Sequence, residues 1–280
     1  STMPPALPKV LFVTSEAFPL IKTGGLADVS GALPAALHGL GLDIKILLPA
    51  YPGVRDKCGE LKLFAELAHP FGSGTIGIWE GHMPDSTVPV LIVAHDAFFN
   101  RIGGPYQKSD GSEWPDNALR FGLLSYVAAW LGSHFEGGWQ PDIVHCNDWQ
   151  TGLAPAYLRF WPGRKPPSVM TIHNLAYQGL FPPENLAPLQ LPAESFKIQG
   201  LEFWGNLSFL KAGIVYSDRI TTVSPSYAEE IQHEPLGFGM HGLLYQRRGV
   251  LSGKYAPGEP HPADSRAATP TTAGPGDART

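Results

Sequence analysis

Short apolar stretches rich in β-branched residues recur along the chain, and longer segments with apolar residues every three or four positions lie between them. The short stretches predict strands, and the segments between them predict helices. Because the predicted strands are almost continuously apolar, we expect both of their faces to be buried, as in a parallel sheet covered by helices. This predicts a doubly wound α/β fold with a mainly parallel, Rossmann-like sheet. The predicted strands are 9–14, 43–48, 88–94, 143–146, 168–172 and 219–223.

Several helix boundaries are also predicted by the sequence. Asp116 stands where an N-cap is expected, and Ser224 precedes a proline at a predicted first helical position. Pro34 lies inside the first helical pattern, where its missing N–H is expected to kink or interrupt the helix. The predicted helices are 26–40, 117–131, 149–160 and a segment that starts at Pro225.

The composition separates a folded part of the chain from its last residues. A length of 280 residues with 43% hydrophobic residues suffices for one large domain or two small ones. Residues 254–280 contain no Val, Ile, Leu, Met, Phe or Trp and are rich in Pro, Gly, Ala and Thr. Such a segment cannot bury enough apolar surface to offset its ordering entropy. We therefore expect a domain over 1–253 and a disordered tail over 254–280.

Charge and cysteine content narrow the function classes. The formal net charge of -5 provides no general attraction to nucleic acid or to an anionic membrane. The two cysteines, Cys58 and Cys146, cannot build a disulfide framework, and the first residues show no signal peptide or membrane segment. The sequence therefore predicts a cytoplasmic protein without nucleic-acid or membrane partners.

The first predicted strand leads into a loop with the features of an anion site. Gly24 and Gly25 stand at the start of a predicted helix, where backbone N–H groups and the helix dipole favour a negative charge. Lys22 can add a positive charge, so a diphosphate site is one interpretation, and an ordinary helix entry with a solvated lysine is the other. The loop lacks the G-x-G-x-x-G spacing of dinucleotide enzymes, which disfavours an NAD cofactor.

Two further strand ends carry polar residues. His145, Cys146 and Asp148 suggest a metal site at first sight, but neighbouring side chains of a strand point to opposite faces and rarely converge on one ion. A sugar site is the better interpretation, because a carboxylate fixes hydroxyl groups and Trp149 offers a flat apolar face. His173, after the next strand, suits either a sugar contact or a structural hydrogen bond.

These segments together resemble glycogen and starch synthases. The similarity lies in residues 9–16 and 22–29, in an H-x-x-D-W segment at 145–149, and in an uninterrupted T-x-H-N-x-x-Y-Q-G segment at 171–179. Asn147 and Gln150 differ from the histidines that are frequent in the family at these positions, which leaves their roles open. The resemblance extends to about residue 253 and implies the N-terminal half of a glycosyltransferase with two Rossmann-like domains.

The resemblance also implies site residues and a reaction. Glucose would be transferred from ADP-glucose to the 4-hydroxyl of an α-1,4-glucan such as glycogen or starch, with retained configuration and without a metal or cofactor. We expect Lys22, Gly24 and Gly25 at the donor diphosphate. Asp28 is expected near the reacting sugar, His173 and Asn174 at the donor sugar, and Asp148, Trp149 and Tyr106 at the acceptor or sugar site.

The similarity to the family is limited to this half of the enzyme. A second Rossmann-like domain with further donor contacts is not visible in the sequence, so the chain alone is expected to be inactive. The tail has the composition expected of a truncated product or of a changed reading frame, and the sequence leaves both interpretations open. A non-catalytic glucan-binding module remains an alternative, with Trp139, Trp149 and Tyr106 as docking residues. A nucleotide-dependent oxidoreductase on the same fold is a second, weaker alternative.

Overall fold

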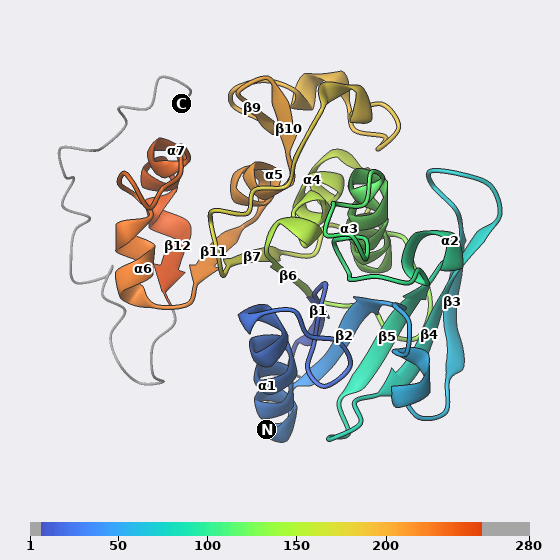
Figure 1. The fold of residues 1–280 in the computed structure, drawn as a ribbon. Coiled ribbons are helices and arrows are strands. Elements are labelled where there is room, and N and C mark those ends of the chain that lie inside the picture. The colour runs from blue at the N-terminus through green and yellow to red at the C-terminus, as the bar shows by residue number, and fades with distance from the viewer. Residues whose placement is uncertain (1–6, 254–280) are drawn as a thin grey trace. The chain divides into compact units, whose positions relative to one another are not determined.

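The computed structural model of the protein describes residues 7–253, and this part of the chain divides into two compact units. Unit 1 contains the described residues up to His145 together with Trp161–Pro167. Unit 2 contains Cys146–Phe160 and the described residues from Ser168 onward. The predicted disordered tail, 254–280, lies outside the described residues. Figure 1 follows the chain from blue to red.

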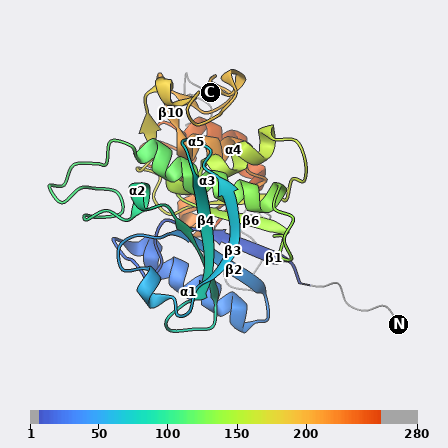
Figure 2. The ribbon, with the colours of Figure 1, turned by 90° about the vertical axis from the view of Figure 1, so that its right-hand side faces the viewer.

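In unit 1, three parallel strands form the centre of the sheet. Strand β1 (Lys9–Val13) pairs with β2 (Asp43–Pro49), and β2 pairs with β5 (Pro89–Ala94). Their inward residues are fully buried aliphatic side chains such as Ile46 and Ile92. The strands β3 (Lys62–Ala68) and β4 (Thr75–His82) continue the sheet beyond β5 as an antiparallel hairpin, which Figure 2 shows towards the viewer. The sequence did not predict this hairpin.

Three α-helices of unit 1 connect these strands. Helix α1 (Gly25–Gly39) continues through Pro34, so of the predicted kink or interruption the interruption does not occur, and the kink stays a prediction. Helix α3 (Asn117–Ser133) starts after Asp116 as predicted, but the carboxylate of Asp116 forms no capping bond and instead accepts two hydrogen bonds from Arg101, at 2.8 and 2.5 Å. The short α2 (Asp96–Phe99) follows β5.

In unit 2, the strands β7 (Ser168–Ile172), β11 (Arg219–Thr222) and β12 (Leu251–Gly253) are parallel. Strand β6 (Ile143–Asn147) starts in unit 1 and ends in unit 2. A small antiparallel sheet has the order β8-β10-β9. Its strands are Leu180–Phe181, Asn206–Ser208 and Glu202–Phe203, and the helices of the unit are α4 (Leu153–Phe160), α5 (Phe209–Tyr216), α6 (Pro225–Glu230) and α7 (His241–Gln246).

Local sequence explains how two of these helices begin. The Ser224 hydroxyl accepts the N–H of Tyr227 at 3.1 Å, with Pro225 at the first helical position, which confirms the predicted start of α6. The predicted helix over 149–160 is instead a 3₁₀ turn, Trp149–Thr151, followed by α4. The strand pairs of the main sheet are mainly parallel and are flanked by helices, so the predicted α/β, Rossmann-like class is confirmed. In such folds, ligands bind at the carboxyl ends of the strands.

Candidate functional site

A buried carboxylate holds the glycine loop that follows β1. Glu16 is 2% exposed, and its Oε1 accepts the N–H groups of Thr23 and Gly24, both at 3.0 Å. Its Oε2 accepts the hydroxyl of Thr23 at 2.6 Å. The loop is therefore folded around one negative charge of the protein itself. Glu16 belongs to the motif at 9–16, but its role was not predictable, because the spacing of residues does not reveal which backbone groups a carboxylate will bind.

Tyr106 lies in the same cluster. Its hydroxyl donates to Glu16 Oε2 at 2.5 Å and lies 2.6 Å from the hydroxyl of Ser15. Because a phenol carries one hydrogen, Ser15 must be the donor to Tyr106. Burial raises the pKa of Tyr106 well above its usual value, and the nearby Tyr51 and Glu16 add to this effect. The tyrosine is thus a permanent donor at neutral pH, and its hydroxyl is engaged within the protein.

Two residues of helix α3 hold the loop that contains Tyr106 through hydrogen bonds. Asn117 donates its amide to the carbonyl of Tyr106 at 3.0 Å. One turn further, the guanidinium of Arg120, 1% exposed, donates to the carbonyls of Phe98 at 2.6 Å and Pro105 at 2.7 Å. A planar group with several donors suits this task, because it can satisfy carbonyls from separate turns of a loop at once.

Lys22 and Asp28 form an ion pair at the mouth of the loop. Their charged atoms are 2.7 Å apart, and the side chains are 47% and 55% exposed. Gly24 and Gly25 open onto free space, since a Cβ at either position would meet no atom within 4 Å. Gly25 is the first residue of α1, one residue before the predicted start of this helix. Unit 1 therefore brings together five predicted site residues, namely Lys22, Gly24, Gly25, Asp28 and Tyr106.

In unit 2, Asp148 joins the ends of β6 and β7. Its Oδ1 accepts the N–H groups of His173 at 2.7 Å and Asn174 at 3.4 Å, and its own N–H donates to the carbonyl of Thr171 at 2.9 Å. Asp148 has a φ of 59°, in the left-handed region that few non-glycine residues adopt. Strained backbone of this kind persists where surrounding contacts fix it, and functional sites are typical places for it.

His173 and Asn174 are both fixed by short-range contacts in unit 2. The Nε2 of His173 is 3.0 Å from Oδ1 of Asn147, so this ring nitrogen carries a hydrogen and donates it. Asn147, whose role the sequence left open, is 1% exposed and orients the imidazole. The side chain of Asn174 accepts the N–H of Ala176 at 3.0 Å and is exposed. Gln150, the other open position, is 6% exposed.

Trp149 packs within unit 2. Its ring centre lies 5.7 Å from that of Phe181 and 5.8 Å from that of Phe209. Gly179 has a φ of 59° and packs against the indole, where a Cβ would lie only 2.6 Å from a ring carbon of Trp149. These ring contacts of Trp149 are packing contacts, and its predicted sugar contact stays a prediction.

Within 7–253, no group of three or more His, Cys, Asp or Glu side chains is arranged to hold a metal ion. The ring of His145 packs on Phe12 with centres 4.9 Å apart, and Cys146 is buried. No helix in this part of the chain is long and apolar enough to cross a membrane.

The fold and the two clusters define a Rossmann-like α/β protein whose polar groups gather at the carboxyl ends of strands. A family model described as the starch synthase catalytic domain matches residues 9–246, and the chain belongs to this family. This confirms the family resemblance inferred from the motifs.

The chain is similar to curated glycogen synthases and to a solved starch synthase. It is 53% identical to glycogen synthase from Nitrosomonas europaea over 250 residues, which cover 88% of this chain and 50% of the relative. It is 54% identical to glycogen synthase from Paramagnetospirillum magneticum over 248 residues, with the same coverage. The catalytic domain of starch synthase IV from Arabidopsis thaliana, bound to ADP and acarbose, matches with a TM-score of 0.77 and 28% identity, over 89% of this chain and 51% of that one. The chain spans about half the length of the curated relatives it matches.

Proposed function

We propose that this chain is the acceptor-side half of a retaining glucosyltransferase that transfers glucose from ADP-glucose to the 4-hydroxyl of an α-1,4-glucan. Family membership over residues 9–246 supports the reaction class. The solved relative was bound to ADP and to acarbose, which supports a nucleotide donor and a carbohydrate acceptor. The observation that carries the proposal is the glycine loop, which Glu16 holds in shape while Gly24 and Gly25 face open space.

The loop suits the charge that develops when the donor bond breaks. The bond between the glucose and the diphosphate is cleaved, and the departing ADP gains negative charge. The ammonium of Lys22 and the first backbone N–H groups of α1 stabilise this charge. Lys22 is paired with Asp28, so the diphosphate must compete with this carboxylate. Asp28, once released, lies near the reacting sugar.

The proposed sugar contacts come from unit 2 and from Tyr106. His173 and Asn174 contact the donor sugar, and Asp148 positions both through their backbone N–H groups. Asp148, Trp149 and Tyr106 serve the acceptor side. The reaction uses no metal or cofactor, so EDTA is expected to leave transfer unchanged. The two cysteines are free thiols, which agrees with a cytoplasmic setting.

The test measures incorporation of ¹⁴C-glucose from ADP-glucose into glycogen. The 280-residue chain alone is expected to show no measurable transfer, because it spans half the length of its relatives. A chimera, in which residues 9–246 replace the matched half of the Nitrosomonas europaea enzyme, is expected to be active. Lys22→Ala should then lower kcat/KM at least about 10-fold, because a charge-assisted contact is lost, whereas the exposed Lys62→Ala serves as the matched control.

Two results would contradict the proposal. One is a folded chimera that transfers no glucose, and the other is a Lys22→Ala chimera with unchanged kcat/KM. If the chain co-sediments with glycogen while the folded chimera transfers no glucose, the alternative of a non-catalytic glucan-binding module is supported instead.

A further inference from the structure

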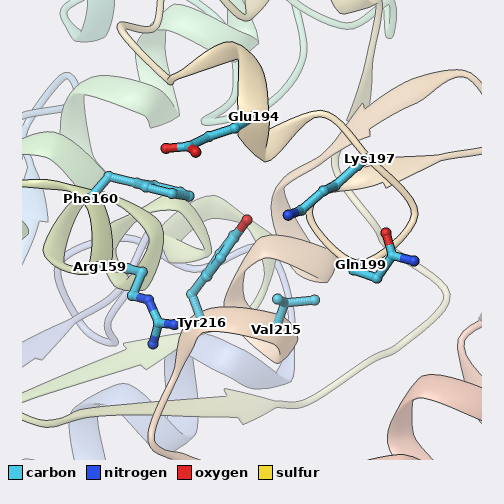
Figure 3. Close-up of a pocket in the computed structure, with 7 residues that line it drawn as sticks. All are labelled: Arg159, Phe160, Glu194, Lys197, Gln199, Val215 and Tyr216. Atoms are coloured by element: carbon cyan, nitrogen blue, oxygen red, sulfur yellow. The ribbon is translucent and has the colours of Figure 1, made fainter.

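A cavity of about 270 Å³ lies in unit 2, between the last residues of α4, the last residues of α5 and the segment that precedes β9. Figure 3 shows the hydroxyl of Tyr216 and the ammonium of Lys197 directed towards each other, with the carboxylate of Glu194 and the ring of Phe160 beside them. The residues that line the cavity are Arg159, Phe160, Glu194, Lys197, Gln199, Val215 and Tyr216.

The cavity is separated within unit 2 from Asp148 and His173. Those residues follow the carboxyl ends of β6 and β7. Helix α4 starts near that edge and ends at Phe160, shortly before β7 begins, and α5 ends at Tyr216, shortly before β11 begins. A helix that leads into a parallel strand ends near the amino end of that strand. The cavity therefore lies at the amino ends of these strands, opposite their carboxyl ends, and is not an extension of the candidate site.

The lining offers hydrogen-bond donors and acceptors together with aromatic faces. Phe160 and Tyr216 meet edge to face, with ring centres 5.2 Å apart at 68°. Burial raises the pKa of Tyr216, so its phenol stays a donor at neutral pH. Lys197 and Gln199 add further donors, and Glu194 provides acceptors. Alternating donors and acceptors beside aromatic rings match a neutral ligand with many hydroxyl groups. The lining carries two cations, Arg159 and Lys197, and one carboxylate, Glu194, so an anion is the competing ligand that the test must distinguish from a glucan.

The segment before β9, which bears Glu194, Lys197 and Gln199, is held by hydrogen bonds from buried side chains. Lys211 is 4% exposed and donates its ammonium hydrogens to the carbonyls of Ile198 at 2.5 Å and Glu202 at 2.6 Å. The buried Ser195 donates to the carbonyl of Pro192 at 2.7 Å. Gly200 allows a close approach to the pocket wall, since a Cβ there would lie 2.1 Å from the Ser195 carbonyl oxygen. A site held by such contacts loses little entropy when it binds.

We propose that this cavity is a second carbohydrate site, which takes one or two glucosyl units of an α-glucan at the amino ends of the unit 2 strands β7 and β11. Its volume is just below the range of about 300–1,000 Å³ typical of small-molecule pockets, which fits a short piece of glucan better than a nucleotide sugar. The choice of glucan among carbohydrates rests on the proposed function. A second contact with the same polymer keeps the chain ends near the enzyme and raises their effective concentration.

The test titrates the full 280-residue chain with maltoheptaose and measures the Kd by calorimetry. Lys197→Ala, Gln199→Ala and Tyr216→Phe each remove one hydrogen-bonding group, and each should raise the Kd about 5- to 10-fold. Tyr216→Phe keeps the ring and its packing on Phe160, so a change in binding cannot be ascribed to misfolding. Lys62→Ala, an exposed lysine of unit 1, should leave the Kd unchanged.

Other outcomes would overturn the proposal. An unchanged Kd in all three pocket variants places the glucan elsewhere, and so does a chain that binds no maltoheptaose. Inorganic phosphate that is bound by the chain and lost in Lys197→Ala, without any glucan effect, assigns an anion site instead.

The chimera separates this inference from the proposed function. With Gln199→Ala and Tyr216→Phe combined, transfer to maltotriose should stay unchanged, while the KM for glycogen should rise several-fold. If transfer to glycogen also stays unchanged, the second site is refuted and the glucosyltransferase assignment stands. If the parent chimera is inactive towards both acceptors, the assignment fails, and the calorimetry alone decides on the pocket.

Discussion

Glu16 is the residue on which the geometry of the glycine loop depends. Its carboxylate accepts hydrogen bonds from two backbone N–H groups, from Thr23 and from Tyr106. In Glu16→Gln, an amide group faces some of these donors and leaves buried hydrogen-bonding groups unpaired. We expect a loss of about 2–4 kcal/mol in the free energy of unfolding, measured by urea denaturation. The exposed Glu66→Gln should stay near the parent value, and equal stability of both variants would contradict this account.

The ion pair of Lys22 and Asp28 leads to a prediction of opposite effects. Exposed pairs contribute about 0–1 kcal/mol, so neither single variant should change stability much. In Asp28→Ala the ammonium of Lys22 no longer has a competing carboxylate, and the affinity for ADP should rise by up to about 5-fold. In Lys22→Ala it should fall by a similar factor. Calorimetric titration of the chimera with ADP checks both, and a loss of affinity in Asp28→Ala would refute competition for Lys22.

The sequence motifs singled out candidate residues but not the hydrogen bonds that these residues make. The motifs identified Asp148, His173 and the glycines, because their residue types and their place after strands are readable. They did not reveal that Asp148 binds the backbone after β7, that Asn147 orients His173, or that Asp116 binds Arg101 instead of capping α3. These contacts join residues distant in sequence, and only the folded chain decides which of several available donors a carboxylate meets.

A pair of histidines links the loop after β3 to the residues after β5. The N–H of Phe71 donates to Nδ1 of His69 at 3.0 Å, so the hydrogen of this imidazole is on Nε2, which lies 3.2 Å from Nε2 of His95. His69 is therefore the donor and His95 the acceptor. A proton added to Nε2 of His95 would place two donors face to face. Burial lowers the pKa of both groups below 6.5, helped by the proximity of the two rings at His69.

These lowered pKa values predict a loss of stability in acid. Below pH 6.5 the histidines bind protons more readily in the unfolded chain than in the folded chain. The free energy of unfolding should therefore be highest above this pH and fall as the pH decreases from 6.5 to 5. In His95→Gln the amide oxygen can still accept from His69 but does not titrate, and the decrease should be smaller. His38→Gln is the control. Urea denaturation at several pH values measures the slope, and an identical slope in His95→Gln would disprove the role of the pair.

Elements with buried, apolar strands were the ones that the sequence predicted correctly. Strand β7 agrees with its predicted range, and β2 differs by one residue. The β3–β4 hairpin was missed because its strands alternate buried and exposed residues, and the stretch around Glu66 has an equally good helical composition. The pairing of β4 with β5 favours the strand conformation, and a local sequence pattern does not reveal pairing partners. The short strands β8 to β10 are below the length at which a pattern can be recognised.

At the scale of the whole molecule, the two cysteines provide one probe for each unit. Cys58 belongs to unit 1 and Cys146 to unit 2, and both are free and fully buried. Burial raises the pKa of Cys58 to about 11 and shifts that of Cys146 in the same direction, so neither thiol forms the reactive thiolate at neutral pH. Labelling with a thiol reagent should therefore be slow in the native chain and require unfolding. Because Glu16→Gln weakens unit 1, it should speed the labelling of Cys58, with Cys58→Ala identifying which signal belongs to which thiol. Rapid labelling of both cysteines in native buffer would contradict the burial of these thiols, since a thiol in a packed core is reached only when the surrounding elements open.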